Sequence, residues 1–577
     1  MLHSVEQGNL SRFFRVGSLG AVVVILAVYH IIFEFNGLRE TEAMDQAQIA
    51  RSVAEGQGFV TQYIRPLAVQ QLLQKSKPIT PYRIPDMNNQ PLYPLLLAAG
   101  MKTTEYSIKA LQYLPFMSEL SPETWMQISP GGMVSGGDRM IAITGMLLFL
   151  ISCVIFYFVA KKLFDQRVAM VGTFVVLVTD MCWRFSMAGL SQMLLLFLFS
   201  LASWFTVSAL EGRSKHSSYI LKLFLAALCF GLMILTHGVT TWIALGWIVF
   251  LGILLRQQIP VVMLLAIFIL LIQLPWMARN YMAFGSPFGL NIYIPFWAGT
   301  DPTEGFFRHL DLGLRGRFGS IRPLFGKNVM LEAANLFKYF GLSVVCLTFF
   351  VSLLHRFRSE VSGNFRWGIF AMWFSGFIGM AFFGISEKAI NANQLHILFI
   401  PLMAFYGVAF LIVLWSRLDI RGAFFRGVFL TGVVTVAAIP MLANFFIGAK
   451  LNVPWPPYVP PFIAVFNTWY NEDEIMCSDM PWAVAWYAER TCVLIPEDPN
   501  TLVRYNDYRL LGNNIVGLYL TPITGDKPLI SQIYTGIYKK WARLITRPPE
   551  TKGFFLPVYT QLPIKGECIL FADRERW

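Results

Sequence analysis

The chain has 577 residues, of which 55% are hydrophobic and only 14% are charged. A soluble domain carries roughly 25% charged residues, so this composition excludes an ordinary soluble protein and predicts a polytopic α-helical membrane protein. The net charge is +12, but the basic residues gather at the ends of apolar segments and form no single patch, which argues against a nucleic-acid partner.

About eleven apolar segments are expected to be membrane helices. Arg12 and Arg15 precede the first, and no small-residue cleavage site follows it, so we expect an uncleaved span and not a signal peptide. The short run Leu92–Met101 is too brief to cross and is expected to be re-entrant or interfacial. The expected spans are 17–35, 138–161, 167–183, 188–210, 219–236, 238–255, 259–277, 335–354, 366–385, 395–415 and 424–446.

The basic clusters between these spans all fall on one side of the membrane, which the positive-inside rule makes the cytoplasm. The other side then receives the outer loops 36–137 and 279–334 and everything after about Lys450. We therefore expect a transmembrane domain over 1–450, a Pro-rich linker over 451–461 and a small non-cytoplasmic α/β domain over 462–577. The clusters are Arg12/Arg15, Lys161/Lys162/Arg167, Arg213/Lys215, Arg256, Arg356/Arg358/Arg366 and Arg417/Arg421/Arg426.

In the C-terminal domain, the helix-like run Met480–Glu489 separates two strand-like runs, which predicts a βαβ unit with parallel strands. If these strands are neighbours, Cys477 and Cys492 could reach the roughly 4.4–6.8 Å Cα separation of a disulfide, with Cys568 as a competing thiol. The domain is expected to cap the outer face above the first loop without supplying catalytic groups. The strand-like runs are Glu474–Ser478, Cys492–Pro496 and Cys568–Phe571.

The segment Glu40–Thr61 follows the first span, where the chain leaves the bilayer. Ala residues at three- and four-residue spacing predict an amphipathic helix that ends near Gly56. Glu42 and Asp45 are three residues apart, so both carboxylates project from nearly one face. Such a carboxylate could act as a general base or could help hold a divalent cation. The same pattern is also typical of acidic residues that only complement the helix dipole.

Four motifs occur in order on the non-cytoplasmic side: IARSVAEGQGF (49–59), PLYP (91–94), PWMARN (275–280) and GSPFG (285–289). In this order they resemble the GT-C class of integral membrane glycosyltransferases. The branch they resemble most holds the protein O-mannosyltransferase-like enzymes and the lipid A aminoarabinose transferase. The resemblance covers roughly residues 10–450. It implies a GT-C fold and transfer of one sugar, with inversion, from a polyprenyl-phosphate donor to an acceptor on the outer face.

The resemblance also implies roles for particular residues. Glu42 falls where the family's catalytic acidic residue sits, and Asp45 lies one turn away, so the base stays open between them. Arg279 would bind the carrier phosphate through its planar guanidinium, or would simply snorkel to the interface. Gln192, in AGLSQML, stands where the family often has an acidic residue. This departure shifts catalysis towards the first loop and weakens the case for a metal-dependent site.

Further substrate-binding candidates are Tyr93 of PLYP, Asn280 of PWMARN, Arg65 of the first loop and Arg315 and Arg317 of the second. For most basic residues of 279–334, a solvated loop is the simpler interpretation. No cofactor and no metal ligand set are expected, although a divalent cation is possible. His237 and His396 lie at expected outer ends of spans, and we assign neither to catalysis.

The sequence therefore predicts a glycosyltransferase that uses a polyprenyl-phosphate sugar and acts on an unidentified lipid, glycan or protein. The expected location is a bacterial inner membrane, with the C-terminal domain in the periplasm. Two alternatives from other classes stay open at this point. A flippase or transporter of lipid-linked sugars would place ionisable groups near the midplane, where the expected spans hold few. A non-catalytic assembly subunit would have no need for carboxylates beside a lipid path.

Overall fold

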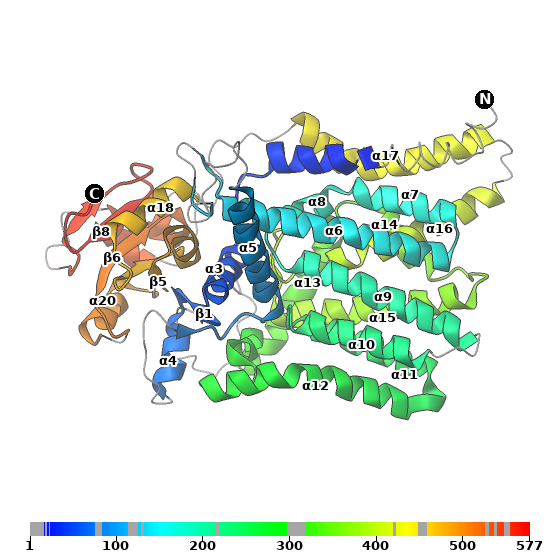
Figure 1. Ribbon diagram of the computed structural model, residues 1–577, viewed down its shortest axis with the longest axis horizontal. Coiled ribbons are helices and arrows are strands. Elements are labelled where there is room, and N and C mark those ends of the chain that lie inside the picture. The colour runs from blue at the N-terminus through cyan, green and yellow to red at the C-terminus, as the bar shows by residue number, and fades with distance from the viewer. Residues whose placement is uncertain are drawn as a thin grey trace.

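The computed structural model describes residues 17, 20–21, 23–74, 84–112, 125–128, 132–214, 219–296, 308, 318–418, 423–447, 458–509, 511–525, 530–535, 539–546 and 554–577. A bundle of apolar helices forms one end of the molecule, and a sheet domain forms the other (Figure 1). Helices of the first loop lie between the two parts. We call the end of the bundle that faces the sheet its domain end, and the opposite end its far end.

The bundle consists of one N-terminal helix and twelve further helices in the described residues. The N-terminal helix spans Val23–Glu34, and its last turn is the π-helix η1 (His30–Glu34). The others are α6 (Gly136–Leu163), α7 (Gln166–Leu177), α8 (Asp180–Met187), α9 (Gln192–Ser214), α10 (Ile220–Ile234), α11 (Thr240–Leu254), α12 (Ile259–Phe284), α13 (Ile321–Tyr339), α14 (Val344–Ser352), α15 (Glu360–Phe383), α16 (Ile400–Arg417) and α17 (Ala423–Ile447).

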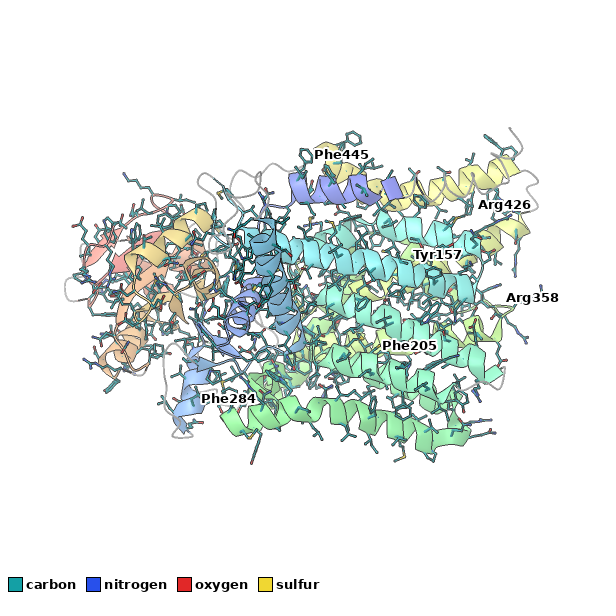
Figure 2. All side chains as sticks on the ribbon, viewed as in Figure 1. Tyr157, Phe205, Phe284, Arg358, Arg426 and Phe445 are labelled. Atoms are coloured by element: carbon teal, nitrogen blue, oxygen red, sulfur yellow. The ribbon has the colours of Figure 1, made fainter. Side chains whose placement is uncertain are left out.

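By length and composition, six of these helices could cross a membrane, and up to eight spans result if each of two bent pairs counts as one. Three shorter apolar helices, at Val23–Glu34, α10 and α11, accompany them. Each of the eleven expected segments overlaps one of these helices or pairs, while the number that cross stays a prediction. Arg358 and Arg426 lie at the far end (Figure 2), as the positive-inside pattern requires of a cytoplasmic side.

The expected straight span 335–354 is wrong in shape. The chain turns by 115° between α13 and α14. Gly341 and Leu342 have positive φ angles of 66° and 57°, and this left-handed backbone ends one helix and redirects the chain. The pair α7 and α8 is bent by 58°. Short 3₁₀ helices complete the bundle: η3 (Arg256–Gln258), η4 (Gly289–Phe296), η7 (Phe318–Ser320) and η8 (His396–Leu398).

The first loop folds into helices and short strands at the domain end. The run expected to be a short interfacial piece is in fact the 20-residue helix α5 (Leu92–Leu111), which lies across the ends of the bundle helices (Figure 1). Strand β1 pairs antiparallel with β3 and contacts α3. The other elements are α3 (Thr41–Ala54), β1 (Val60–Thr61), β2 (Tyr63–Ile64), α4 (Pro66–Gln74) and β3 (Ile84–Pro85).

The C-terminal sheet has six strands in the order β2-β5-β4-β6-β8-β7. The strands β2, β5, β4 and β6 run parallel, and β8 and β7 are antiparallel. The edge strand β2 comes from the first loop, so residues 462–577 do not build the sheet alone. The elements are α18 (Pro460–Trp469), β4 (Ile475–Ser478), α19 (Pro481–Ala483), η9 (Val484–Ala488), β5 (Thr491–Leu494), α20 (Pro499–Asp507), β6 (Ile515–Leu520), η10 (Pro522–Gly525), η11 (Ile530–Thr535), η12 (Lys539–Trp541), α21 (Ala542–Thr546), β7 (Val558–Thr560) and β8 (Ile569–Ala572).

The expected parallel βαβ unit is present, but its disulfide is not. Both Cys477 and Cys492 are free, buried thiols. In the register of β4 and β5, Cys492 pairs with Met476, and Cys477 pairs with Val493. Because successive side chains of a strand point to opposite faces, this one-residue offset puts the two thiols on opposite faces of the sheet.

We therefore expect all seven cysteines to be reduced in the folded protein, because all seven are free and buried. A maleimide reagent should label native protein slowly and should label seven thiols after denaturation in SDS without reductant. Mass spectrometry of the labelled chain makes this count. A product with five labels and one Cys477–Cys492 crosslink would contradict the observed register.

Candidate active site

Helix α3 is enclosed by other parts of the protein. The sequence predicts an amphipathic helix with one face exposed to solvent, and the structure does not have that exposed face. It begins at Thr41 and ends at Ala54, and Gly56 follows with a positive φ of 81°, as expected for a helix stop. Every residue from Ala43 to Ser52 is buried. The polar residues on this stretch have buried partners, because α3 is packed between α5 and the C-terminal domain (Figure 1).

Asp45 is the centre of a buried polar cluster. Its Oδ2 accepts a hydrogen bond from Arg65, at 2.5 Å, and another from the side-chain amide of Asn89, at 2.8 Å. Its Oδ1 accepts from Gln48, one turn along α3. The Asp45 side chain is 2% exposed, so these protein donors take the place of water.

Asp86 is a second carboxylate in the same cluster. Its Oδ1 lies 3.7 Å from Arg65 and accepts from the Asn89 side chain at 3.3 Å. Its Oδ2 accepts from the backbone N–H groups of Asn88 and Asn89, which makes an Asx-type turn. Arg65 and Asn89 thus bridge both carboxylates, and all four residues of this cluster, which we call the Asp45–Asp86 cluster, are buried.

The electrostatics of the cluster depend on Arg65. Burial disfavours its charged form, but Asp45 and Asp86 outweigh that effect and raise the pKa of Arg65 above its ordinary value. Burial, followed by the charge of Asp45, raises the pKa of Asp86, and Arg65 opposes this rise. The ring of Tyr63 lies 3.9 Å from the Arg65 guanidinium and covers its face. The guanidinium is therefore held as a cation between two carboxylates.

Arg279 extends this network to helix α12. Its guanidinium donates to the backbone carbonyls of Asp86, at 2.6 Å, and Phe59, at 3.1 Å, and to the side chain of Asn280, at 2.9 Å. It also lies over the ring of Trp276. The side chain is half-buried, and two of its five N–H donors lie outside these three bonds. Arg279 is thus more constrained than a snorkelling side chain.

Three of the four sequence motifs, those at 49–59, 275–280 and 285–289, contact one another or the 86–89 turn through backbone groups. Phe59 ends the first motif and is bonded to Arg279 of the third. Leu290, next to the fourth, donates to the carbonyl of Met87. Gly289 approaches so closely that a Cβ there would lie 2.2 Å from the same carbonyl oxygen, and its φ is 59°. Only glycine fits that position without displacing the 86–89 turn.

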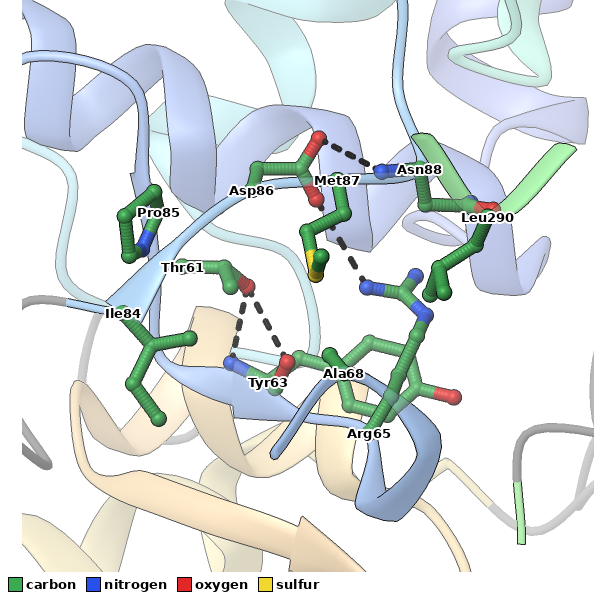
Figure 3. A pocket seen from close by; sticks show the side chains of 10 residues that line it. All are labelled: Thr61, Tyr63, Arg65, Ala68, Ile84, Pro85, Asp86, Met87, Asn88 and Leu290. Carbon is green, nitrogen blue, oxygen red and sulfur yellow. Dashed lines mark hydrogen bonds and ion pairs between the residues drawn. The ribbon is translucent and has the colours of Figure 1, made fainter. Parts of the chain in front are cut away.

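A small pocket opens beside Arg65 and Asp86 (Figure 3). Its cavity volume is about 10 Å³, room for about one water molecule and far below the roughly 300–1,000 Å³ of typical ligand pockets. In Figure 3 the Arg65 guanidinium points towards Asp86, while Thr61 holds the backbone of Tyr63. Its lining residues are Thr61, Tyr63, Arg65, Ala68, Ile84, Pro85, Asp86, Met87, Asn88 and Leu290.

Three of the side chains expected to bind substrate donate hydrogen bonds to backbone carbonyls. Gln192 is buried, and its amide donates to the carbonyls of Asn391 and Ala392. The hydroxyl of Tyr93 donates to the carbonyl of Gly189, and the amide of Asn280 donates to that of Pro287. These bonds hold neighbouring loops at the domain end. Arg315 and Arg317 lie outside the described residues.

Glu42 and Asp45 differ in accessibility, although both belong to α3. Glu42 lies in the first turn of α3 and is half-buried, whereas Asp45 is almost wholly enclosed. Of the two histidines that we left out of catalysis, His396 is buried and His237 is half-buried. His396 faces Glu332 at 2.9 Å through Nε2 and accepts from Trp373 through Nδ1, so its ring is held by two neighbours.

The sequence matches no protein-family model and no curated protein. Similar solved structures exist at 11% identity. Apo ArnT from Cupriavidus metallidurans has a TM-score of 0.53 and covers 98% of both chains. ArnT bound to undecaprenyl phosphate has a TM-score of 0.51 over 97% of this chain and 98% of that one. The Archaeoglobus fulgidus oligosaccharyltransferase AglB, with an inhibitory peptide and a dolichol-phosphate, has a TM-score of 0.52 over 98% of this chain and 75% of that one.

The chain has the GT-C fold. This confirms the fold class expected from the four motifs, together with the small C-terminal sheet domain. The GT-C assignment rests on the similarity of the whole chain to these structures. The Asp45–Asp86 cluster is a separate observation, made from the contacts within this chain.

The sequence analysis missed two members of the cluster, Asp86 and Asn89. A signal for them exists in the run Pro85-Asp-Met-Asn-Asn-Gln-Pro91, where an Asp between prolines with Asn two and three residues later is typical of an Asx turn. Arg51 was also missed. It donates to the carbonyls of Ala485 and Trp486 and pairs with Glu489, so it ties this GT-C helix to the C-terminal domain.

These contacts predict different effects on stability for the two acidic residues of α3. Asp45→Asn leaves Arg65 short of a buried counter-charge, which typically costs about 3–5 kcal/mol. Glu42→Gln should change stability by far less, because Glu42 is half-buried. Thermal unfolding of both variants in detergent makes the comparison. Equal midpoints for Asp45→Asn and Glu42→Gln would show that the buried ion pair does not stabilise the fold.

Proposed function

We propose that this protein is a glycosyltransferase that moves a sugar from a polyprenyl-phosphate donor to an acceptor at the domain end of its membrane bundle. The observation that carries the proposal is the Asp45–Asp86 cluster, where the first loop, α12 and the 86–89 turn converge in a GT-C fold. Two similar structures support the choice of donor, because ArnT was solved with undecaprenyl phosphate and AglB with a dolichol-phosphate.

In this proposal Glu42 is the general base. The acceptor hydroxyl attacks the anomeric carbon, its proton passes to the Glu42 carboxylate, and the bond from that carbon to the carrier phosphate breaks with inversion. Glu42 suits this role better than Asp45 because a base must touch the acceptor. Asp45 is enclosed and already accepts three hydrogen bonds, so we assign it the positioning of Arg65 and Asn89.

Arg279 holds the leaving carrier phosphate in this proposal. A guanidinium can offer two parallel N–H donors to a phosphate, and Arg279 retains two N–H groups outside its bonds to the protein. It lies near the end of α12, at the domain end of the bundle, where a lipid phosphate would sit with its chain in the bilayer. A lipid-phosphate leaving group also removes the need for a nucleotide-binding motif.

The transporter alternative gains no specific support from the buried ionisable groups. A transport site places such groups near the midplane, on broken helices. Glu332 lies on α13, one helix of the bent pair α13–α14, but its partner His396 lies just before α16, at the opposite end of that helix from Arg417 and so away from the midplane. The Asp45–Asp86 cluster belongs to the first loop, because Asp45 lies on α3 and Asp86 directly follows β3.

Glu42→Gln should lower turnover by roughly 10²–10⁴-fold, the usual loss when a general base is removed. The assay is transfer of label from a panel of radiolabelled undecaprenyl-phosphate sugars in membrane vesicles. Glu55→Gln is the matched control, because Glu55 is an exposed acid at the other end of α3. Full activity in Glu42→Gln would contradict the role of Glu42 as the general base.

Arg279→Ala should weaken binding of undecaprenyl phosphate by about 10- to 100-fold, since hydrogen bonds to charged groups contribute about 1.5–3 kcal/mol. Arg279→Lys should restore only part of this, because an ammonium lacks the planar fork. Arg139→Ala is the control, because Arg139 is an exposed arginine at the same end of the bundle. Binding to purified protein in detergent is the measurement. Equal affinity in the Ala, Lys and unchanged proteins would remove Arg279 from the phosphate site.

A further inference from the structure

Two buried carboxylates face one guanidinium in the Asp45–Asp86 cluster. One terminal nitrogen of Arg65 lies 2.5 Å from Asp45, and the other lies 3.7 Å from Asp86. The side chains of Asp45, Arg65 and Asp86 are at most 5% exposed. Paired carboxylates of this kind are the usual ligands of Mg²⁺ or Ca²⁺, so we asked whether these residues fit a divalent cation.

Arg65 already offsets part of the negative charge of the cluster. Asp45 and Asp86 supply two negative charges and Arg65 supplies one positive charge between them, so the three side chains together carry one net negative charge. A divalent cation added to this set would leave an excess of buried positive charge beside Arg65. Such a state is unfavourable in a site that excludes water.

The donor set also does not fit a metal. Mg²⁺ takes about six oxygen ligands, and Ca²⁺ takes about six to eight. Here the oxygens of both carboxylates accept hydrogen bonds from Arg65, Asn89, Gln48 and the turn at 88–89. Within the described part of the chain, no group of three or more His, Cys, Asp and Glu side chains could hold a metal ion.

We propose that Arg65 takes the place of a divalent cation, and thereby holds Asp45 and Asp86 at a fixed spacing without a bound metal. Arg65 is then a positioning residue that acts on α3 through Asp45. The corollary that sugar transfer needs no metal rests on the proposed function. The claim about metal binding does not, so the two can fail separately.

The proposal is tested by Mn²⁺ binding to the full-length protein, purified in detergent and treated with a chelator, with free Mn²⁺ followed by electron paramagnetic resonance. The unchanged protein should bind no stoichiometric Mn²⁺ at this site. Arg65→Ala should bind one Mn²⁺ per chain, because it leaves two carboxylates facing an empty space. The double variants Arg65→Ala/Asp45→Asn and Arg65→Ala/Asp86→Asn should lose that ion.

Arg279→Ala is the matched control, because it removes a neighbouring guanidinium but leaves Arg65 between the carboxylates, and it should bind no Mn²⁺. Stoichiometric Mn²⁺ in the unchanged protein that is lost in Asp45→Asn would overturn the proposal. So would a folded Arg65→Ala that binds none. An Arg65→Ala protein that folds only when Mn²⁺ is present would support it, and one that stays unfolded with and without Mn²⁺ would contradict it.

Discussion

The buried ion pair between Asp45 and Arg65 is the constraint on which the domain end of this protein depends. Both partners are excluded from water. Removing Arg65 leaves two buried carboxylates without their counter-charge, and removing Asp45 leaves Arg65 with only the more distant Asp86. The pair joins α3 to the chain that follows β2, and Asn89 joins the 86–89 turn to the same carboxylate. Arg279 then attaches this turn to α12. One network thereby fixes segments that are far apart in the sequence against the end of the bundle.

The C-terminal domain completes the enclosure of α3. Arg51 reaches from α3 to backbone carbonyls of η9, and β2 pairs with β5 in the domain's sheet. From the bundle side, Asp138 accepts hydrogen bonds from Trp486 and Tyr487. The domain therefore fixes the position of α3, the helix that carries Glu42 and Asp45. The sequence analysis expected only a cap above the first loop. Its contribution to the candidate site is the strand pairing of β2 with β5 and the backbone carbonyls that accept from Arg51.

Long-range patterns made the fold accessible from sequence. Apolar runs with basic ends located the bundle helices, and four ordered motifs pointed to the GT-C fold, because these signals extend over many residues. The two-residue strand β2 carries no periodicity and could not be found, nor could its pairing with β5 across more than 400 residues. Gln192 was a candidate for substrate binding because of its place in the sequence. Only the structure shows that its amide donates to the backbone carbonyls of residues 391 and 392. Asp86 was missed because it stands outside the motifs, even though its turn signature is local.

A map of the full-length protein in lipid nanodiscs with bound undecaprenyl phosphate tests the account most directly. The account predicts the phosphate at the domain end, within hydrogen-bonding distance of Arg279, roughly 2.7–3.2 Å, with Glu42 facing the space next to it. A phosphate bound at the far end among the cytoplasmic basic residues, or near the midplane of the bundle, would contradict it.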